Sequence, residues 1–357
     1  MSHSTSSNLP SLLTKREYIA ELTERASKLG KGDRAAVMTM AFAPWEPEIA
    51  TLLDALGGAA KRGANVLLSV DAYGFLAGHG AQLGPLVWHK QLPARMTGVF
   101  AERQQALKQL ETRGGRVVIT NQPPRLLTSP VAGRSHIKFG VVNDDVWIGG
   151  CNLDSPSDID LMAQWQDKAL AGWLVALPLR AEVAGSVHAV QHDTDSTRPT
   201  AWDAELLVDA GVRRQSHILE QALRVVDEAK ERILLTCQFF PSRVMARHLA
   251  RAVKRGVQVE LIYNHPNKHQ KPHHALHHAT RTVEQLMRPG ELFVHELPQS
   301  QMYIHAKLLV TEKAAMLSSH NYVEAGVQFG TAEIALLSTN PAFAAEAEAV
   351  LRAQLRQ

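Results

Sequence analysis

The sequence predicts an α/β protein of two similar lobes, each a mixed β-sheet flanked by helices, related by a pseudo-twofold axis around one composite site. Two observations predict this class. The 357-residue chain contains three pairs of similar segments in the same order, and each copy alternates amphipathic helices with short apolar strands. The composition, 45% hydrophobic and 20% charged residues, is that of a globular protein that needs no disulfide to stabilise its core.

The duplication rests on matched residues within each pair of segments. Both copies of the first segment contain Thr-x-x-Phe-x-Pro, both copies of the second contain Lys-Arg-Gly before an apolar run, and both copies of the third contain His-x-Lys. The paired segments are 33–44 and 230–241, 59–71 and 252–264, and 135–152 and 304–321. Because three pairs occur in one order, we interpret the chain as two copies of one structural unit.

Each copy is predicted to fold through the same series of elements. A helix with apolar residues every three to four positions comes first, followed by a buried strand. An amphipathic helix then ends at a glycine suited to a left-handed cap, and a second strand follows directly. This order predicts a right-handed crossover and parallel pairing, with two further strands around the His-x-Lys segment. The expected ranges are helices 15–29 and 214–229 and strands 35–40, 65–70, 232–237 and 258–263.

Composition also predicts the domain limits and the compartment. We expect an N-terminal segment and helix at 1–29, a first lobe at 30–198 and a second lobe at 199–357, because a polar, aperiodic stretch surrounds residue 198. Cys151 and Cys237 are the two cysteines, and each is interpreted as a small buried residue. The start lacks the basic-then-apolar order of a signal peptide. We therefore expect a cytoplasmic protein with peripheral contact at the inner membrane face.

The third pair of segments carries the residues with the clearest chemistry. A histidine and a lysine two residues apart on a strand project from one face, and an asparagine follows after the turn. Two such half-sites facing each other offer two imidazoles, two cations and two amides, which suit a phosphodiester. One imidazole can attack phosphorus while the other protonates the leaving oxygen. The residues are His136, Lys138 and Asn152 in the first copy and His305, Lys307 and Asn321 in the second.

These two blocks resemble the paired His-x-Lys-x4-Asp and Gly-Ser-x-Asn motifs of the phospholipase D superfamily. The Gly-Gly-x-Asn form at Gly149–Asn152 and the Val-Asp-x-x-Gly stretch at Val70–Gly74 look most like bacterial cardiolipin synthases and related phosphatidyltransferases. The resemblance implies a phospholipid substrate and a reaction through a phosphohistidine that needs neither metal nor cofactor. It implies that His136 is the nucleophile and that His305 is the general acid and then the base. Lys138, Lys307, Asn152, Asn321 and Ser319 would hold the phosphate.

The resemblance also implies an acidic partner for each histidine. Glu333 fits the second half, and Asp160 aligns best in the first half, with Asp167 as the alternative. The motif departs from the family pattern at three positions, which are Asn143, Gly150 and Glu312. These departures keep open an alternative, a degenerate module that binds phosphate or lipid without catalysis.

A nuclease or phosphodiesterase acting on nucleic acid is the other alternative. Such a protein would favour a strongly basic groove with stacking aromatic residues. The net charge of +3 and the aromatic content of 6% do not indicate one.

Two inserts are candidates for substrate contact. The Gly-rich, apolar stretch 74–100 is interpreted either as a loop packed on its lobe or as a lid that touches lipid. The stretch 265–278 holds six histidines, interpreted as solvated surface, as a basic rim over an anionic site or as metal ligands.

Overall fold

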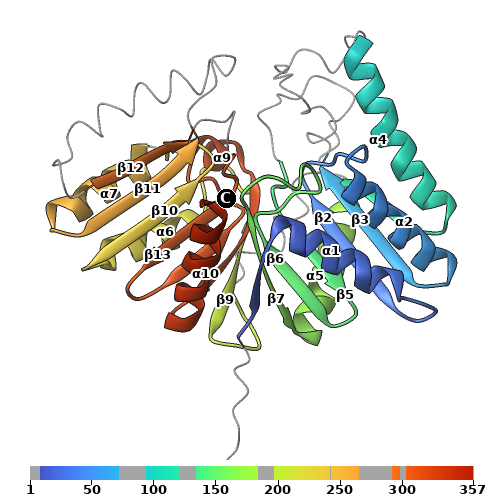
Figure 1. The fold of residues 1–357 in the computed structure, drawn as a ribbon, viewed down its shortest axis with the longest axis horizontal. Helices are drawn as coiled ribbons and strands as arrows, with labels where there is room; N and C mark the ends of the chain where they lie inside the picture. Colours follow the sequence, from blue (N-terminus) through green and yellow to red (C-terminus); the bar gives the residue numbers. More distant parts are fainter. Residues whose placement is uncertain are drawn as a thin grey trace, which may run out of the picture.

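The computed structural model describes residues 9–71, 94–120, 134–183, 197–241, 243–264, 292–297 and 303–356. These residues form two mixed β-sheets with helices packed against them, which confirms the expected fold class (Figure 1). The sheets have seven and eight strands, in the orders β1-β7-β6-β5-β2-β3-β4 and β12-β11-β10-β13-β14-β15-β9-β8. The inserts at 74–93 and 265–278 lie outside the described residues.

The elements of the first sheet come from the N-terminal part of the chain. The strands are β1 Ser11–Thr14, β2 Arg34–Thr39, β3 Asn65–Asp71, β4 Arg116–Thr120, β5 Phe139–Val142, β6 Asp145–Gly149 and β7 Leu161–Gln166. The helices are α1 Lys15–Ser27, α2 Pro47–Lys61, α4 Ala94–Thr112 and α5 Lys168–Val183.

The elements of the second sheet follow. Its strands are β8 Arg198–Pro199, β9 Ala204–Ala210, β10 Arg232–Cys237, β11 Gln258–Asn264, β12 Leu292–Leu297, β13 Lys307–Thr311, β14 Ala315–Ser318 and β15 Ala332–Ser338. Its helices are α6 His217–Glu228, α7 Arg243–Lys254, α9 Glu324–Phe329 and α10 Pro341–Gln354.

The two sheets repeat one topology. β2 and β3 pair in parallel, as do β10 and β11, while β5 and β13 run antiparallel to β2 and β10. α2 and α7 make the crossovers, and the glycines two residues after their ends, Gly63 and Gly256, have φ values of 92° and 89°. This conformation favours glycine, which explains the Lys-Arg-Gly match.

Sequence periodicity missed several strands. β1 and β9 precede the first helix of each copy and pair with β7 and β15, while β4 and β12 extend the parallel part of each sheet. β1 has only four residues, and β12 has no fully buried side chain. Strands this short or this exposed give little periodic signal.

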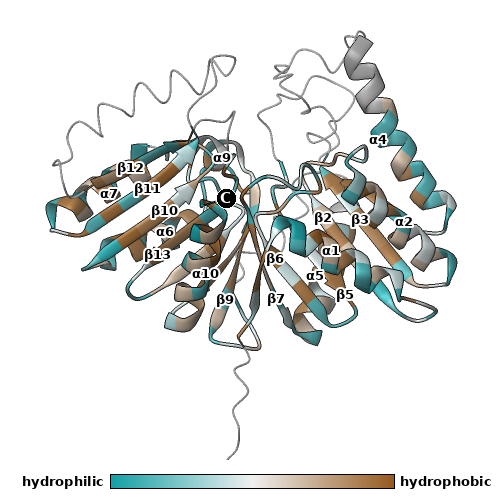
Figure 2. Ribbon diagram, viewed as in Figure 1, coloured by the Kyte–Doolittle hydropathy of each residue, from teal (hydrophilic) through white to brown (hydrophobic). Residues whose placement is uncertain are grey.

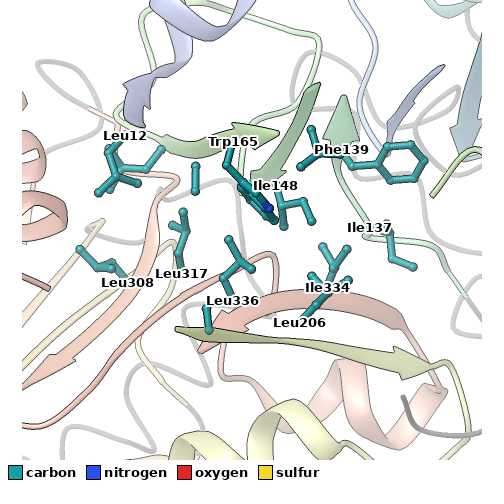
Figure 3. Close-up of a cluster of buried hydrophobic side chains, with 14 of the residues drawn as sticks. Leu12, Ile137, Phe139, Ile148, Trp165, Leu206, Leu308, Leu317, Ile334 and Leu336 are labelled. Atoms are coloured by element: carbon teal, nitrogen blue, oxygen red, sulfur yellow. The ribbon is translucent and has the colours of Figure 1, made fainter. Parts of the chain in front are cut away.

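A hydrophobic core joins the two sheets. Buried side chains from β5, β6 and β7 face those from β9, β14 and β15, and Figure 3 shows the two sets pointing toward one another. Trp165 contacts Trp202 with ring centroids 6.0 Å apart. The strands are strongly hydrophobic along most of their length (Figure 2), as expected where both faces of a sheet are covered. This shared core holds β5, β6 and β7 of the first sheet against β9, β14 and β15 of the second.

No helix in the described parts of the chain is both long and apolar enough to cross a bilayer. The most hydrophobic candidate, α5, has its apolar residues in the shared core, where Leu170 and Leu174 are buried.

Candidate functional site

The two His-x-Lys segments lie where the lobes meet, and each is bonded to the opposite lobe. The His136 N–H donates to the carbonyl of Ala332 at 2.8 Å, and the His305 N–H donates to the carbonyl of Ile159 at 2.8 Å. The sequence placed both histidines within strands. They instead precede β5 and β13, because their backbone groups pair across the lobe junction before the sheet ladders begin.

These backbone bridges bring each histidine to a carboxylate from the other half of the chain. His136 Nδ1 lies 2.9 Å from Glu333 Oε2, and His305 Nδ1 lies 2.6 Å from Asp160 Oδ2. All four side chains are at least nine-tenths buried. A carboxylate at Nδ1 fixes the tautomer that carries hydrogen on Nδ1, so that Nε2 is a free base. Each half-site is therefore completed by the other lobe.

The two imidazoles face a common space. Their ring centroids are 6.4 Å apart and the ring planes meet at 68°. Reacting atoms approach to about 3–3.5 Å in a near-attack geometry, so two rings at this centroid separation lie close enough for both to contact one phosphate group.

Burial and charge set the protonation of these pairs. Burial lowers the pKa of His136 to about 4 and that of His305 to about 3, and the neighbouring carboxylates only partly oppose this. Burial raises the pKa of Glu333 and Asp160, but the partner histidine outweighs it and the pKa of each falls to about 2. At neutral pH both carboxylates are ionised and both imidazoles are neutral. A neutral imidazole is the form that can act as a nucleophile.

The two lysines are fully buried beside the histidines. Lys138 Nζ donates to the carbonyl of His136 at 2.7 Å, and Lys307 Nζ donates to the carbonyl of His305. Burial lowers the pKa of Lys138 to about 7 and that of Lys307 to about 8. A bound anion would restore the charged form, so these ammonium groups are suited to hold a phosphate.

The two asparagines are held differently. Asn152 Oδ1 accepts from the backbone N–H of Ala41 at 3.3 Å. Asn321 Oδ1 is buried and has no hydrogen-bond partner among the described residues.

The side chain of Ser319 makes two hydrogen bonds within its half-site. Its hydroxyl is fully buried, donates to Glu333 Oε2 and accepts from the backbone of Ile334 at 3.0 Å. The hydrogen is therefore directed to the carboxylate and is not available to a phosphate.

Three positioning residues escaped sequence reasoning. Asp71 Oδ2 accepts from the Ser135 N–H at 2.7 Å, and Asn264 Oδ1 accepts from the Ile304 N–H at 2.8 Å, so each holds the residue before a histidine. Asp71 and Asn264 are the last residues of two matched segments of the duplication. This correspondence could have identified them as a pair with the same role.

The third such residue is Lys15, which is buried at the start of α1. It binds Asp154 and Asp158, which lie in the loop that delivers Asp160 to His305. A single lysine in a predicted helix gives no comparable signal in the sequence.

Two of the three departures from the family motif, Asn143 and Glu312, follow the ends of β5 and β13, and the structure explains both. Asn143 Oδ1 accepts from the backbone of Arg34, while Glu312 accepts from the backbone of Lys230 at 2.8 Å. Both side chains thus secure the loop before the first parallel strand of their lobe. Neither position contacts the histidines, so both substitutions leave the paired-histidine arrangement complete.

Asp167, the alternative partner, lies elsewhere. Its carboxylate accepts from the Leu170 N–H at 2.9 Å at the start of α5 and from the Ala201 N–H at 3.2 Å. Cys151 and Cys237 are buried, and burial raises the pKa of both thiols. No group of three potential metal ligands occurs within the part of the chain that the structure describes. The histidines of 265–278 are outside that part.

Comparisons with known proteins agree with this arrangement. Residues 223–355 match the family model described as "Cardiolipin synthase, PLD-like domain". The crystal structure of phosphatidylserine synthase from Haemophilus influenzae Rd KW20 matches with a TM-score of 0.71 at 16% identity, over 99% of this chain and 87% of that one. Polyphosphate kinase from Porphyromonas gingivalis matches with a TM-score of 0.56 at 14% identity, over 98% of this chain and 50% of that one. A comparison with curated protein sequences found no match.

The fold and the site together define a two-lobed α/β protein with paired histidines at the lobe junction. The resemblance to the phospholipase D superfamily is confirmed for residues 223–355 by the match to the cardiolipin synthase, PLD-like domain, and the likeness to phosphatidylserine synthase confirms the fold over nearly the whole chain.

Proposed function

We propose that this protein catalyses phosphatidyl transfer or phosphodiester hydrolysis on phospholipids through a phosphohistidine intermediate. The crossed pairs His136–Glu333 and His305–Asp160 are the observation that carries this proposal. They present two neutral imidazoles, each oriented by a carboxylate, with ring centroids 6.4 Å apart. An in-line displacement at phosphorus requires a neutral imidazole as the nucleophile and a second imidazole that carries a proton for the leaving oxygen.

In the first step His136 Nε2 attacks phosphorus. The bond from phosphorus to the leaving oxygen breaks, and that oxygen takes a proton from Nε2 of His305, which is neutral in the free site and gains this proton when the anionic phosphodiester binds. The positive charge that develops on the ring of His136 is stabilised by Glu333 at Nδ1. In the second step His305 Nε2 removes a proton from water or an alcohol, whose oxygen attacks phosphorus and frees His136. Water gives hydrolysis, and an alcohol gives transfer.

The remaining groups of the site would bind the phosphate oxygens. Lys138 and Lys307 become fully charged when an anion enters, and Asn152 and Asn321 supply amide hydrogens. Charge in the transition state develops on the equatorial oxygens, so donors that are already in place lower the barrier without reorganisation.

The phospholipid substrate rests on the comparisons. The family model is named for cardiolipin synthase, and the similar structure of phosphatidylserine synthase spans nearly the whole chain. We therefore propose cardiolipin-type synthesis as the leading specific reaction, with contact at a membrane surface.

An assay on mixed lipid vesicles tests the proposal. Vesicles containing phosphatidylglycerol are incubated with added glycerol and EDTA, with wild type and His136→Ala in parallel. We expect lipid product from the wild type, retained in EDTA and lost in the variant. The ratio of phosphatidic acid to transferred product then distinguishes hydrolysis from transfer. Wild-type protein that converts no lipid would contradict the proposal, and cleavage of single-stranded DNA instead would favour a nuclease.

A further inference from the structure

The two half-sites hold their carboxylates by different but equivalent means. At the end of β6 the Gly150 N–H donates to the carbonyl of Leu161 at 3.1 Å, and at the end of β14 the Ser319 N–H donates to the carbonyl of Ile334 at 2.9 Å. The main chain is therefore the same in both halves. What differs is the side chain, glycine or serine, and the length of the acid, which is Asp160 just before β7 and Glu333 near the start of β15.

In the first half the acid itself completes the backbone hydrogen bonding. Asp160 Oδ2 binds His305 Nδ1, while Oδ1 of the same carboxylate accepts from the N–H of Leu161 at 2.9 Å. Gly150 leaves the space that this carboxylate occupies. A Cβ at position 150 would lie 3.0 Å from Asp160 Cγ and would overlap Oδ1. A serine therefore cannot fit beside this aspartate.

In the second half a serine side chain, and not the acid, accepts the hydrogen bond from the backbone. The N–H of Ile334, which corresponds to Leu161, donates to Ser319 Oγ at 3.0 Å. The serine hydroxyl in turn donates to Glu333 Oε2, the same oxygen that accepts from His136 Nδ1. The extra methylene of glutamate moves its carboxylate away from its own backbone, and Ser319 fills that place. A buried backbone amide without an acceptor is costly, so each half needs one of the two solutions.

We propose that Gly150–Asp160 and Ser319–Glu333 are two interchangeable matched pairs, and that Ser319 is a positioning residue for Glu333 and not a phosphate ligand. This inference rests on the proposed function. It explains why the first copy of the motif has glycine where the family pattern has serine: the shorter acid supplies the second acceptor itself. It also makes the half-sites unequal, because Glu333 Oε2 is shared between His136 and Ser319.

The test is a pair of double-mutant cycles with two readouts, kcat/KM on the lipid substrate and Tm. The single variants are Gly150→Ser, Asp160→Glu, Ser319→Gly and Glu333→Asp, and the double variants are Gly150→Ser/Asp160→Glu and Ser319→Gly/Glu333→Asp. Ser157→Gly, at an exposed serine in the 151–160 loop, is the matched control for loss of a side chain. We expect each mismatched single variant to lose about 10²-fold in kcat/KM, because a displaced catalytic group has this effect. Each single variant should also lose about 2–6 °C in Tm.

Rescue is the decisive outcome. Each double variant should recover to within about tenfold of wild-type kcat/KM and regain most of the lost Tm, since the pairwise coupling is large for residues in contact. Additive losses in both readouts would overturn the inference while leaving the proposed function intact. If the wild type converts no lipid, the proposed function fails, and recovery of Tm still decides whether the residues form matched pairs.

Discussion

His136 Nδ1 lies 2.9 Å from Glu333 Oε2, although 197 positions separate the two residues in the chain. The reciprocal contact between His305 and Asp160 spans 145 positions. Each imidazole is thus oriented by the lobe that does not carry it, and neither lobe holds a complete half-site alone. Because the lobes share one hydrophobic core, this crossing is fixed by packing as well as by hydrogen bonds.

The crossed pairs predict which acidic residues are needed for activity. Asp160→Asn and Glu333→Gln should each lower kcat by about 10²–10⁴-fold, since the imidazole loses the anion that orients it and stabilises its charge. Asp167→Asn is the matched control, because Asp167, among the residues that the structure describes, accepts hydrogen bonds from the backbone near α5 and does not contact either histidine. Steady-state kinetics on folded variants provide the measurement. Equal loss in Asp160→Asn and Asp167→Asn would contradict the assignment.

The buried lysines predict pH-dependent anion binding. Burial lowers the pKa of Lys138 to about 7 and that of Lys307 to about 8, so both ammonium groups lose their proton as the pH rises through this range. An oxyanion favours the charged form, and its affinity should therefore fall from pH 6 to pH 9. Calorimetric titration with sulfate, whose charge is constant here, measures this, with Lys138→Met as the test and the exposed Lys108→Met as the control. Affinity that does not change with pH would argue against these lysines as the anion ligands.

Asp209 predicts an unusual dependence of stability on pH. It lies opposite Glu333 on the neighbouring strand. Burial raises the pKa of Asp209 to about 7, despite hydrogen bonds from Ser216 and Ile218. A carboxyl whose pKa is raised on folding binds its proton more tightly in the folded state. Its contribution to stability is therefore lost as the pH rises from about 4 through 7.

Asp209→Asn should accordingly stabilise the protein at pH 8 relative to pH 5. We expect at least about 1 kcal/mol, the free energy of roughly one pKa unit. Thermal unfolding at the two pH values measures the difference, and Asp203→Asn, at an exposed carboxyl in the loop before β9, is the control. A variant that is less stable than wild type at pH 8 would show that Asp209 stabilises the fold as an anion.

The contacts of Asn143 predict that replacing it changes the stability of the protein but not its activity. Its amide donates to Asp33 Oδ1 at 3.1 Å, and its φ of 52° is tolerated by asparagine and aspartate. Asn143→Asp restores the family residue but places two carboxylates together, so we expect a loss of about 1 kcal/mol in stability. kcat/KM below the unfolding temperature should remain within about twofold of wild type. A large gain in activity on restoring the aspartate would mean that this position acts on the chemistry.

The repeated units of the fold could be predicted from the sequence, but the contacts between the two lobes could not. Matched segments located β2, β3, β10, β11 and both His-x-Lys blocks, because burial imposes a period on long elements. The short strand β1 and the exposed strand β12 left no such period. Alignment of the two copies identified Asp160 and Glu333, but their exchange between lobes depends on tertiary packing that no local pattern encodes.

The hydrogen bonds of Ser319 could not be predicted from the sequence for a related reason. The family pattern places a serine near the phosphate, but the direction of its hydroxyl depends on the length of the acid at position 333. A contact between residues 14 positions apart, in adjacent strands, is visible only once the register of β14 and β15 is known. The sequence analysis also did not single out Lys15 and Asp209, because their partners come from other elements.

Trapping the phosphohistidine tests the two-histidine chemistry most directly. A phosphatidyl ester of p-nitrophenol needs no proton on its leaving oxygen, so His305→Asn should still form the intermediate. That variant lacks the base that activates water and should therefore accumulate the adduct. We predict an alkali-stable, acid-labile phosphatidyl group on the peptide that contains His136, present in His305→Asn and absent in His136→Asn. An adduct on another residue, or none in His305→Asn while wild-type protein turns the ester over, would contradict the mechanism.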